Sequence, residues 1–306
     1  MRLVICVGFL NEERYLPAFL QTVAAQTRLP DRLLLVDDGS TDRSPEIVRE
    51  FAAEHPWARV LARPPRPPER DRLAQAHEYK AFLWAQAQID EPHDVVAKMD
   101  ADLRLNPSLV ESVMAAFEAE PRLGIAGGPL SVKTDEGGLR RERSPADHVR
   151  GPNKFYRRAC LDAIMPVPAI AGWEAIDEAK AHMQGWTTRM VEPPGPDTVH
   201  LRPTGAHDGR LRGFRRMGSN TWSYGAHPLA VLLGGVSRLR ERPPVLAGFA
   251  FVGGWAYAAL KRYPRAEPEV RAVVRREQLR RIRGYLPLGS RSADSASVTN
   301  ASDSDR

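Results

Sequence analysis

Cysteine is scarce in this chain, and its scarcity excludes a fold held together by disulfides. Cys6 and Cys160 are the 2 cysteines among 306 residues, and both stand in apolar stretches far apart in the sequence. Two such thiols form no disulfide framework, and a reducing compartment fits them best. A chain of this length buries roughly 75% of the surface of its unfolded state, so a hydrophobic core suffices to stabilise it.

Long apolar runs are missing as well. The most apolar stretch, residues 245–260, is shorter than the roughly 20 residues that a membrane-spanning helix needs. Three placements stay open for it: a helix in or re-entering the membrane interface, a helix in the core or a dimer contact, and a span. The arginines that flank it favour a membrane surface. No signal peptide is visible at the start, because Asn11-Glu12-Glu13 interrupts the first apolar run.

Positive charge is concentrated near the C-terminus. The formal net charge is +6, and residues 261–283 hold 9 Lys and Arg against 3 Glu. Such a segment suits phosphate-bearing partners. Its arginines fall near helical spacing and lack the interleaved aromatic side chains of a nucleic-acid stacking platform. We therefore expect an anionic membrane surface as a partner and no nucleic acid. Residues 288–306, rich in Ser, Asp and Ala, are expected to be disordered.

Residues 1–105 alternate apolar strands with amphipathic helices. Strands are expected at Leu3–Gly8, Arg32–Val36 and Val95–Met99. This alternation predicts a mostly parallel α/β sheet, which binds its ligand beyond the carboxyl ends of the strands. Further along the chain, one strand is expected over residues 124–132 and a helix over Trp173–Met183.

Acidic residues stand at the ends of two of these strands. Asp37-Asp38 follows one strand, and Asp100-Ala101-Asp102 follows another. Alternate residues of an extended segment point the same way, so Asp100 and Asp102 can address one divalent cation. One carboxylate of the first pair can accept hydrogen bonds from a base or a ribose. Together the two clusters suggest an enzyme that holds a nucleotide-diphosphate donor through a metal.

Four motifs in order resemble those of the family 2 glycosyltransferases, which have the GT-A fold. They are Val7–Glu13, Val36–Asp42, Asp100-Ala101-Asp102, and Gly172–Glu178 followed by Gly185-Trp186. The resemblance covers residues 1–205. It implies a Rossmann-like α/β fold with a mostly parallel central sheet flanked by helices, and we expect a C-terminal helical extension after it.

The resemblance divides the chain into a donor half and an acceptor half. Residues 1–105 would form the nucleotide-sugar-binding half of the GT-A domain, and residues 106–215 the acceptor and catalytic half. Residues 216–287 would be an apolar and basic helical extension that contacts a membrane surface or a second copy. The disordered tail would follow at 288–306.

The resemblance also implies roles at the matching positions. Asp38 would contact the base of the donor nucleotide, above a floor made by Phe9, Leu10, Asn11 and Glu12. Asp100 would meet the ribose or the metal, and Asp102 would hold Mn²⁺ or Mg²⁺ on the diphosphate. His200, after a predicted strand, is a candidate metal ligand or diphosphate contact.

The general base falls where this chain departs from the family. The usual Glu-Asp pair, whose Asp is the base, stands eleven residues before a Gly-aromatic pair. Glu174 takes the position of that Asp relative to Gly185, and Trp173 replaces the Glu. Asp177, one helical turn further on, is a second candidate. Inverting transfer needs one carboxylate to take the proton of an acceptor hydroxyl, while a metal supports the departing diphosphate.

We therefore expect an inverting, metal-dependent transferase that moves a sugar from a nucleotide-diphosphate donor to a saccharide or lipid-linked acceptor. It would assemble a polysaccharide or glycolipid at the cytoplasmic face of the cell membrane. One alternative is a Mg²⁺-dependent nucleotidyltransferase, which usually begins with a Gly-rich loop that Gly8–Glu12 does not contain. Another is a non-enzymatic nucleic-acid or scaffold binder using the Arg-rich C-terminus. The sequence leaves open the donor sugar and whether the protein forms a homodimer.

Overall fold

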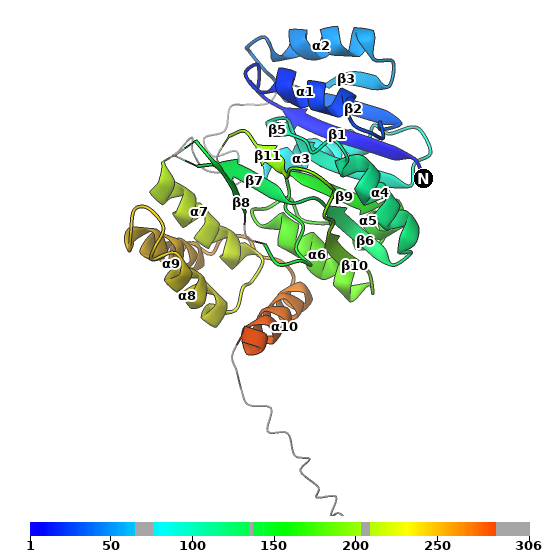
Figure 1. Cartoon of the computed structure of the whole chain (residues 1–306). Coiled ribbons are helices and arrows are strands. Elements are labelled where there is room, and N and C mark those ends of the chain that lie inside the picture. The colour runs from blue at the N-terminus through cyan, green and yellow to red at the C-terminus, as the bar shows by residue number, and fades with distance from the viewer. Residues whose placement is uncertain (65–75, 135–136, 143, 203–208, 286–306) are drawn as a thin grey trace, which may run out of the picture.

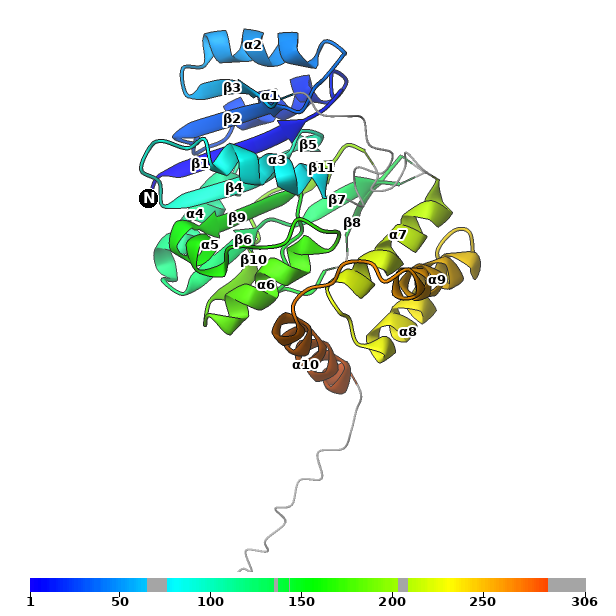
Figure 2. The ribbon, with the colours of Figure 1, turned by 180° about the vertical axis from the view of Figure 1, so that it is seen from behind.

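A seven-stranded sheet with the order β10-β6-β9-β4-β1-β2-β3 forms the centre of the computed structural model (Figures 1 and 2). The structure describes residues 1–64, 76–134, 137–142, 144–202 and 209–285. The strands of this sheet are β1 (Leu3–Phe9), β2 (Arg32–Asp37), β3 (Ala58–Ala62), β4 (Val95–Asp100), β6 (Leu123–Gly127), β9 (Asn153–Arg157) and β10 (Thr187–Met190). Neighbouring strands are parallel except where β9 pairs with β4 and β6. The predicted α/β fold with a mostly parallel sheet is confirmed.

Helices cover both faces of this sheet. The helices of the domain are α1 (Leu16–Ala24), α2 (Ser44–Glu54), α3 (His77–Gln86), α4 (Leu109–Ala119), α5 (Arg158–Ile164) and α6 (Trp173–Met183). Side chains of α1, α2 and α4 share one hydrophobic cluster with the sheet, and those of α3, α5 and α6 share a second. The sheet is therefore the middle layer of three.

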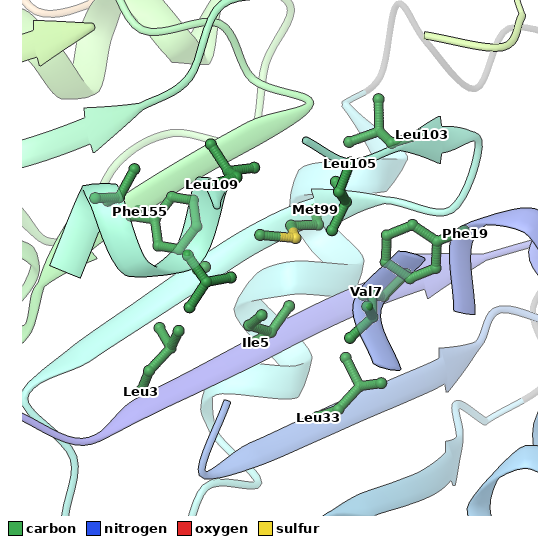
Figure 3. Packing of buried hydrophobic residues seen from close by; sticks show 14 of the residues in the cluster. Leu3, Ile5, Val7, Phe19, Leu33, Met99, Leu103, Leu105, Leu109 and Phe155 are labelled. Carbon is green, nitrogen blue, oxygen red and sulfur yellow. The ribbon is translucent and has the colours of Figure 1, made fainter. Parts of the chain in front are cut away.

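Alternate residues of β1 point into the two clusters. Leu3, Ile5 and Val7 pack with Phe19 of α1 and Leu109 of α4, as Figure 3 shows. The residues between them face the second cluster. Because both faces of these strands are buried, the sequence has near-continuous apolar runs where they form.

Strand order reverses at β1, which lies between β2 and β4. The chain runs from β1 through β2 to β3 at one edge and then returns to β4 on the other side of β1. The register places Phe9 beside Asp37 and Gly8 beside Asp100. An open α/β sheet binds ligands in the crevice at such a point, so the two acidic clusters lie on either side of the expected site.

The single strand expected over residues 124–132 is wrong, because the chain forms two strands there. β6 ends at Gly127, and β7 (Leu130–Lys133) belongs to a second sheet with the order β5-β11-β7-β8. The other strands of this sheet are β5 (Leu103–Arg104), β8 (Leu139–Arg141) and β11 (Thr198–His200). A Cβ atom on Gly127 would lie 2.3 Å from the carbonyl oxygen of Asn153. Pro129 has no N–H with which to continue the first ladder.

Within residues 209–285, four helices follow the two sheets: α7 (Arg210–Ser223), α8 (Pro228–Ser237), α9 (Leu246–Leu260) and α10 (Pro268–Tyr285). Figures 1 and 2 show α7, α8 and α9 together to one side of the central sheet, which confirms the predicted helical extension. α7 and α9 cross closely, since a Cβ atom on Gly218 would lie 1.8 Å from the Phe251 carbonyl oxygen. The tail at 288–306 lies outside the described residues.

None of the helices in the described ranges is both long and apolar enough to cross a membrane. α9, which covers most of residues 245–260, has 15 residues.

α10 is joined to α6 by a pH-sensitive pair. His182 Nδ1 lies 2.7 Å from Glu277 Oε1. The hydrogen bond to Glu277 raises the pKa of His182 above its ordinary value, although partial burial opposes this. Because His182 binds its proton more tightly in the folded than in the unfolded state, protonation stabilises the fold. This stabilisation is complete below the pKa of histidine in the unfolded chain, near 6.5. This contribution is lost as the pH rises through the raised value.

We expect Glu277→Gln to lower the free energy of unfolding by about 0.5 kcal/mol at pH 6, because the charged pair is lost. At pH 9, where His182 is neutral in the wild type too, the variant and the wild type should be nearly equal. Urea unfolding at both pH values measures the difference. Equal losses of unfolding free energy at pH 6 and pH 9 would show that the charged His182–Glu277 pair does not stabilise the fold.

Candidate active site

Two loops meet beyond the carboxyl ends of β1 and β2. The Asn11 N–H donates to Ser40 Oγ at 3.0 Å, and the Thr41 N–H donates to Asn11 Oδ1 at 2.8 Å. The Glu12 N–H donates to Ser44 Oγ at 2.7 Å. Asn11 has a φ of 55°, a left-handed conformation that asparagine tolerates. These bonds place the predicted floor residues Phe9, Leu10, Asn11 and Glu12 against the loop that contains Asp38.

Asp38 is held in a defined orientation. Its Oδ1 accepts a hydrogen bond from Arg63 Nη1 at 2.6 Å, and its side chain is 4% exposed. The Asp38 N–H donates to the Phe9 carbonyl at 2.9 Å. Arg63 follows β3 and reaches Asp38 only because β3 pairs with β2. The carboxylate is thereby a positioned acceptor directly beyond the carboxyl end of β2.

Asp100, Asp102 and His200 converge next to these loops. One ligand atom from each lies within 4.8 Å of the others. Asp100 ends β4, Asp102 follows in the turn before β5, and His200 ends β11. His200 Nε2 lies 3.2 Å from Asp102 Oδ1, whereas the buried Nδ1 has no hydrogen-bond partner among the described residues. Two carboxylates suit Mg²⁺ or Mn²⁺, and a transition metal also accepts the imidazole, so the residues fit a divalent cation.

Two cations of the chain contact the same carboxylates. Lys98 Nζ hydrogen-bonds to Asp100, and Arg202 Nε donates to Asp102 Oδ2 at 3.1 Å. Arg202 also pairs with Glu12. Burial raises the pKa of Asp102, but His200 and Arg202 outweigh it and hold the pKa below its ordinary value. Asp102 is therefore ionised at neutral pH, as a metal ligand has to be.

Glu174 lies in the first turn of α6 and is partly exposed. Its Oε2 accepts a hydrogen bond from the Gly151 N–H at 2.7 Å. Burial raises the pKa of Glu174, but the charges of Arg150, His148 and Lys154 outweigh it and leave the pKa below its ordinary value. The side chain is thus an ionised carboxylate on a partly exposed residue.

Asp177 lies one turn further along α6 and is fully buried. Its Oδ1 accepts from Lys154 Nζ at 2.8 Å, and its Oδ2 accepts from the Tyr156 hydroxyl at 2.6 Å. Burial raises the pKa of Asp177 to about 6. Both carboxylate oxygens are engaged within the protein, so Glu174 is the accessible member of the two predicted candidates.

Trp173, which stands where the family has a Glu, fills a space between two lysines. It is buried and stacks on Tyr79 with ring centroids 4.2 Å apart. The ammonium groups of Lys98 and Lys154 lie 5.6 and 5.5 Å from its ring centroid. Its Nε1–H donates to Glu78 Oε1 at 3.2 Å. The indole therefore stands in place of an acid beside two lysines that already have acidic partners. Lys98 pairs with Asp100, and Lys154 pairs with Asp177.

Four charged residues near the site were not predicted from the sequence: Lys98, Lys154, Arg63 and Glu78. A signal was present for Lys98, which interrupts the apolar run of β4, and a weaker one for Lys154, which directly precedes Phe155 and Tyr156 in β9. A buried lysine needs anionic partners, so these positions imply acids nearby. Arg63 and Glu78 have no such signal, because their partners are set by strand pairing and helix packing.

The fold and the acidic cluster at the switch point of its sheet define a protein of the GT-A class. The chain belongs to the family described as glycosyl transferase family 2, whose model matches residues 4–170, more than half of the chain. The resemblance seen in the sequence is confirmed.

Among curated proteins, the chain is similar to an uncharacterized glycosyltransferase, alr2836, of Nostoc sp. The two are 23% identical over 125 residues, which make up 41% of this chain and 35% of that protein. The match thus spans about a third of the length of this curated relative.

Among solved structures, the chain is similar to the mannosyltransferase PcManGT from Pyrobaculum calidifontis in complex with GDP-Man and Mn²⁺. The TM-score is 0.54 at 17% identity, over 94% of this chain and 81% of that one. It also matches S. aureus TarS with a TM-score of 0.48 and 16% identity, over 87% of this chain and 44% of that one. The likeness to the mannosyltransferase shows the fold.

Proposed function

We propose that this protein is an inverting glycosyltransferase that moves a sugar from a nucleotide-diphosphate donor to an acceptor hydroxyl. The observation that carries the proposal is the convergence of Asp100, Asp102 and His200 at the switch point of a GT-A sheet. Membership of the family supports it, and so does the fold shared with a mannosyltransferase solved with GDP-Man and Mn²⁺. Neither the nucleotidyltransferase nor the nucleic-acid alternative has such support.

On this proposal the donor lies across the ends of β1, β2 and β4. Asp38 accepts hydrogen bonds from the base, above the loop that begins at Phe9. Asp100, Asp102 and His200 hold Mn²⁺ or Mg²⁺. The cation, when bound, acts as a Lewis acid that stabilises the negative charge of the departing diphosphate. Arg202, which contacts Asp102, adds a further positive charge at the same place.

Glu174 acts as the general base. It takes the proton of the acceptor hydroxyl while that oxygen forms a bond to the anomeric carbon. The bond from the anomeric carbon to the diphosphate oxygen breaks in the same step, and the configuration inverts. The Gly151 N–H and the charges of Arg150 and Lys154 hold the carboxylate oriented and ionised before the acceptor arrives.

The acceptor on this proposal is a saccharide or a lipid-linked saccharide, in the assembly of a polysaccharide or glycolipid. We place the enzyme at the cytoplasmic face of a membrane, as a peripheral protein. Exposed apolar side chains on α8 and α9 support this location. A homodimer is the other use that such side chains allow.

Thermal-shift measurements with UDP-, GDP- and dTDP-sugars, with and without Mn²⁺, test the donor site. A donor at 100 times its dissociation constant should stabilise the protein by about 2.7 kcal/mol. Asp102→Asn should abolish the part that depends on Mn²⁺, whereas Asp162→Asn, on the exposed surface of α5, should not. No shift with any donor, or a shift indifferent to Mn²⁺, would overturn the proposed function.

A further inference from the structure

Two neighbouring helices expose stripes of large apolar side chains. On α8 the stripe is Leu229, Leu232, Leu233 and Val236, and on α9 it is Leu246, Phe249, Tyr257 and Leu260. Phe249 is 70% exposed and Leu260 82%. In each helix the exposed positions recur at the spacing of a single helical face. Neither stripe is therefore a scatter of isolated surface residues.

Packing within the protein uses other faces of these helices. The buried positions are Val231 and Gly235 on α8, and Ala247, Gly248, Phe251, Gly254 and Ala258 on α9. A Cβ atom on Gly254 would lie 1.9 Å from the Arg215 carbonyl of α7, and one on Gly235 would lie 2.6 Å from Val252 of α9. The helices are thus fully docked on one another while both stripes stay exposed.

The two stripes adjoin at the corner between the helices. The Val245 N–H donates to the Leu239 carbonyl at 2.9 Å, and both side chains are exposed. This bond brings the end of the α8 stripe to the start of the α9 stripe. We call the two stripes and this corner the α8–α9 apolar face. Figures 1 and 2 show its helices at the side of the molecule, next to α7.

Exposed cations stand at both ends of α9. Arg240 and Arg242 precede the helix, and Lys261 and Arg262 follow it. Glu241 is the only acid between residues 228 and 266. A surface that is apolar along its length and cationic at both ends is complementary to the headgroups and acyl boundary of an anionic bilayer.

We propose that the α8–α9 apolar face docks on an anionic lipid bilayer, with α9 lying in the plane of the interface. The inference rests on the proposed function, a transferase working at a membrane surface, and assigns the surface that makes the contact. A second copy of the chain fits less well. Symmetric pairing along α9 would bring the cationic ends of two copies together, in either direction, whereas anionic lipid neutralises all four cations.

Vesicle co-sedimentation without donor or metal tests the apolar contribution. The wild type should bind vesicles of phosphatidylcholine with phosphatidylglycerol, and Phe249→Glu with Leu260→Glu should weaken that binding at least tenfold, because buried charge in the interface is costly. Leu233→Glu and Leu29→Glu form a matched pair, since these leucines are 46% and 45% exposed and Leu29 lies on the loop before β2. Only the first of the pair should weaken binding.

A triple variant, Arg240→Gln with Arg242→Gln and Lys261→Gln, removes three of the four positive charges and tests the electrostatic contribution. Each cation near an anionic surface contributes about fivefold, so the triple variant should bind anionic vesicles about 100-fold more weakly. Arg2→Gln, Arg122→Gln and Lys133→Gln, all exposed on the GT-A domain, form the control and should have little effect. Vesicles of phosphatidylcholine alone should bind the wild type weakly.

Failure to bind anionic vesicles, or equal binding by the variants and their controls, would overturn the inference. So would a wild type that sediments as a dimer and becomes a monomer on Phe249→Glu, because a second copy would then cover the face. The Mn²⁺-dependent thermal shift with donor, measured on the same variants without lipid, should be unchanged. If the wild type binds vesicles but shows no Mn²⁺-dependent shift with any donor, the proposed function is overturned and the docking of the α8–α9 apolar face on a bilayer is not.

Discussion

Replacing Glu174 by glutamine is expected to lower the rate of sugar transfer about a thousandfold, within the range measured for general bases. Glutamine keeps the shape of the side chain and can still accept from the Gly151 N–H, but it cannot take a proton. The Mn²⁺-dependent thermal shift with donor should remain, because Glu174 lies outside the proposed metal cluster of Asp100, Asp102 and His200. Single-turnover kinetics measures the loss.

Asp177→Asn is the control for this experiment. Its carboxylate oxygens already accept from Lys154 and Tyr156 in the core, so the change should lower stability and leave the rate of the folded enzyme within about tenfold of the wild type. Loss of turnover in a folded Asp177→Asn protein, with turnover retained in Glu174→Gln, would reassign the base to Asp177.

Replacing Lys154 by methionine is expected to lower the free energy of unfolding by about 3 to 5 kcal/mol. Lys154 has no exposed surface, and its Nζ donates to the Glu174 carbonyl at 2.8 Å and lies 3.2 Å from Glu178 Oε1. Burial raises the pKa of Glu178, but His148 and Lys154 outweigh it and lower the pKa to about 2. Without the lysine, Asp177 and Glu178 are left as buried acids with one cation fewer.

Urea unfolding measures this loss of unfolding free energy, and two further variants test its cause. Lys133→Met, an exposed lysine on β7, should change the stability by less than about 0.5 kcal/mol. Lys154→Met combined with Asp177→Asn should recover part of the loss, since the buried charge that lost its partner is also removed. A loss below 1 kcal/mol for Lys154→Met alone would show that the ammonium is not the centre of this network.

The strands and the metal cluster were predictable because each rests on a local rule. A strand buried on both faces needs a continuous apolar run, as in Leu33–Val36 and Val95–Ala97. Acids directly after such runs lie at one edge of a parallel sheet, and this placed Asp38 and Asp100 on either side of β1. The family resemblance made His200 a candidate, whereas its position beside Asp102 comes from the pairing of β11 with β5.

The division between β6 and β7 was predictable only in part, because the local sequence contains a strand breaker but not the distant neighbour that contacts the end of β6. Gly127-Gly128-Pro129 favours a break within residues 124–132, and the approach of Asn153 to Gly127 sets the end of β6 there. The choice between Glu174 and Asp177 likewise depends on residues that are distant in the sequence. Both are acids on one helix, and their difference lies in Lys154 and Tyr156, which come from β9.

The amino-acid sequence alone was enough for the fold class, the family and the placement of Asp38, Asp100 and Asp102 at one edge of the sheet, because apolar runs, strand ends and motif order are properties of short segments. The folded chain was needed to show which acid is accessible, which cations neutralise the metal cluster, and which faces of α8 and α9 stay exposed. These depend on burial and charge contributed by segments distant in the sequence. Burial and charge act through space, whereas a motif records only what is adjacent along the chain.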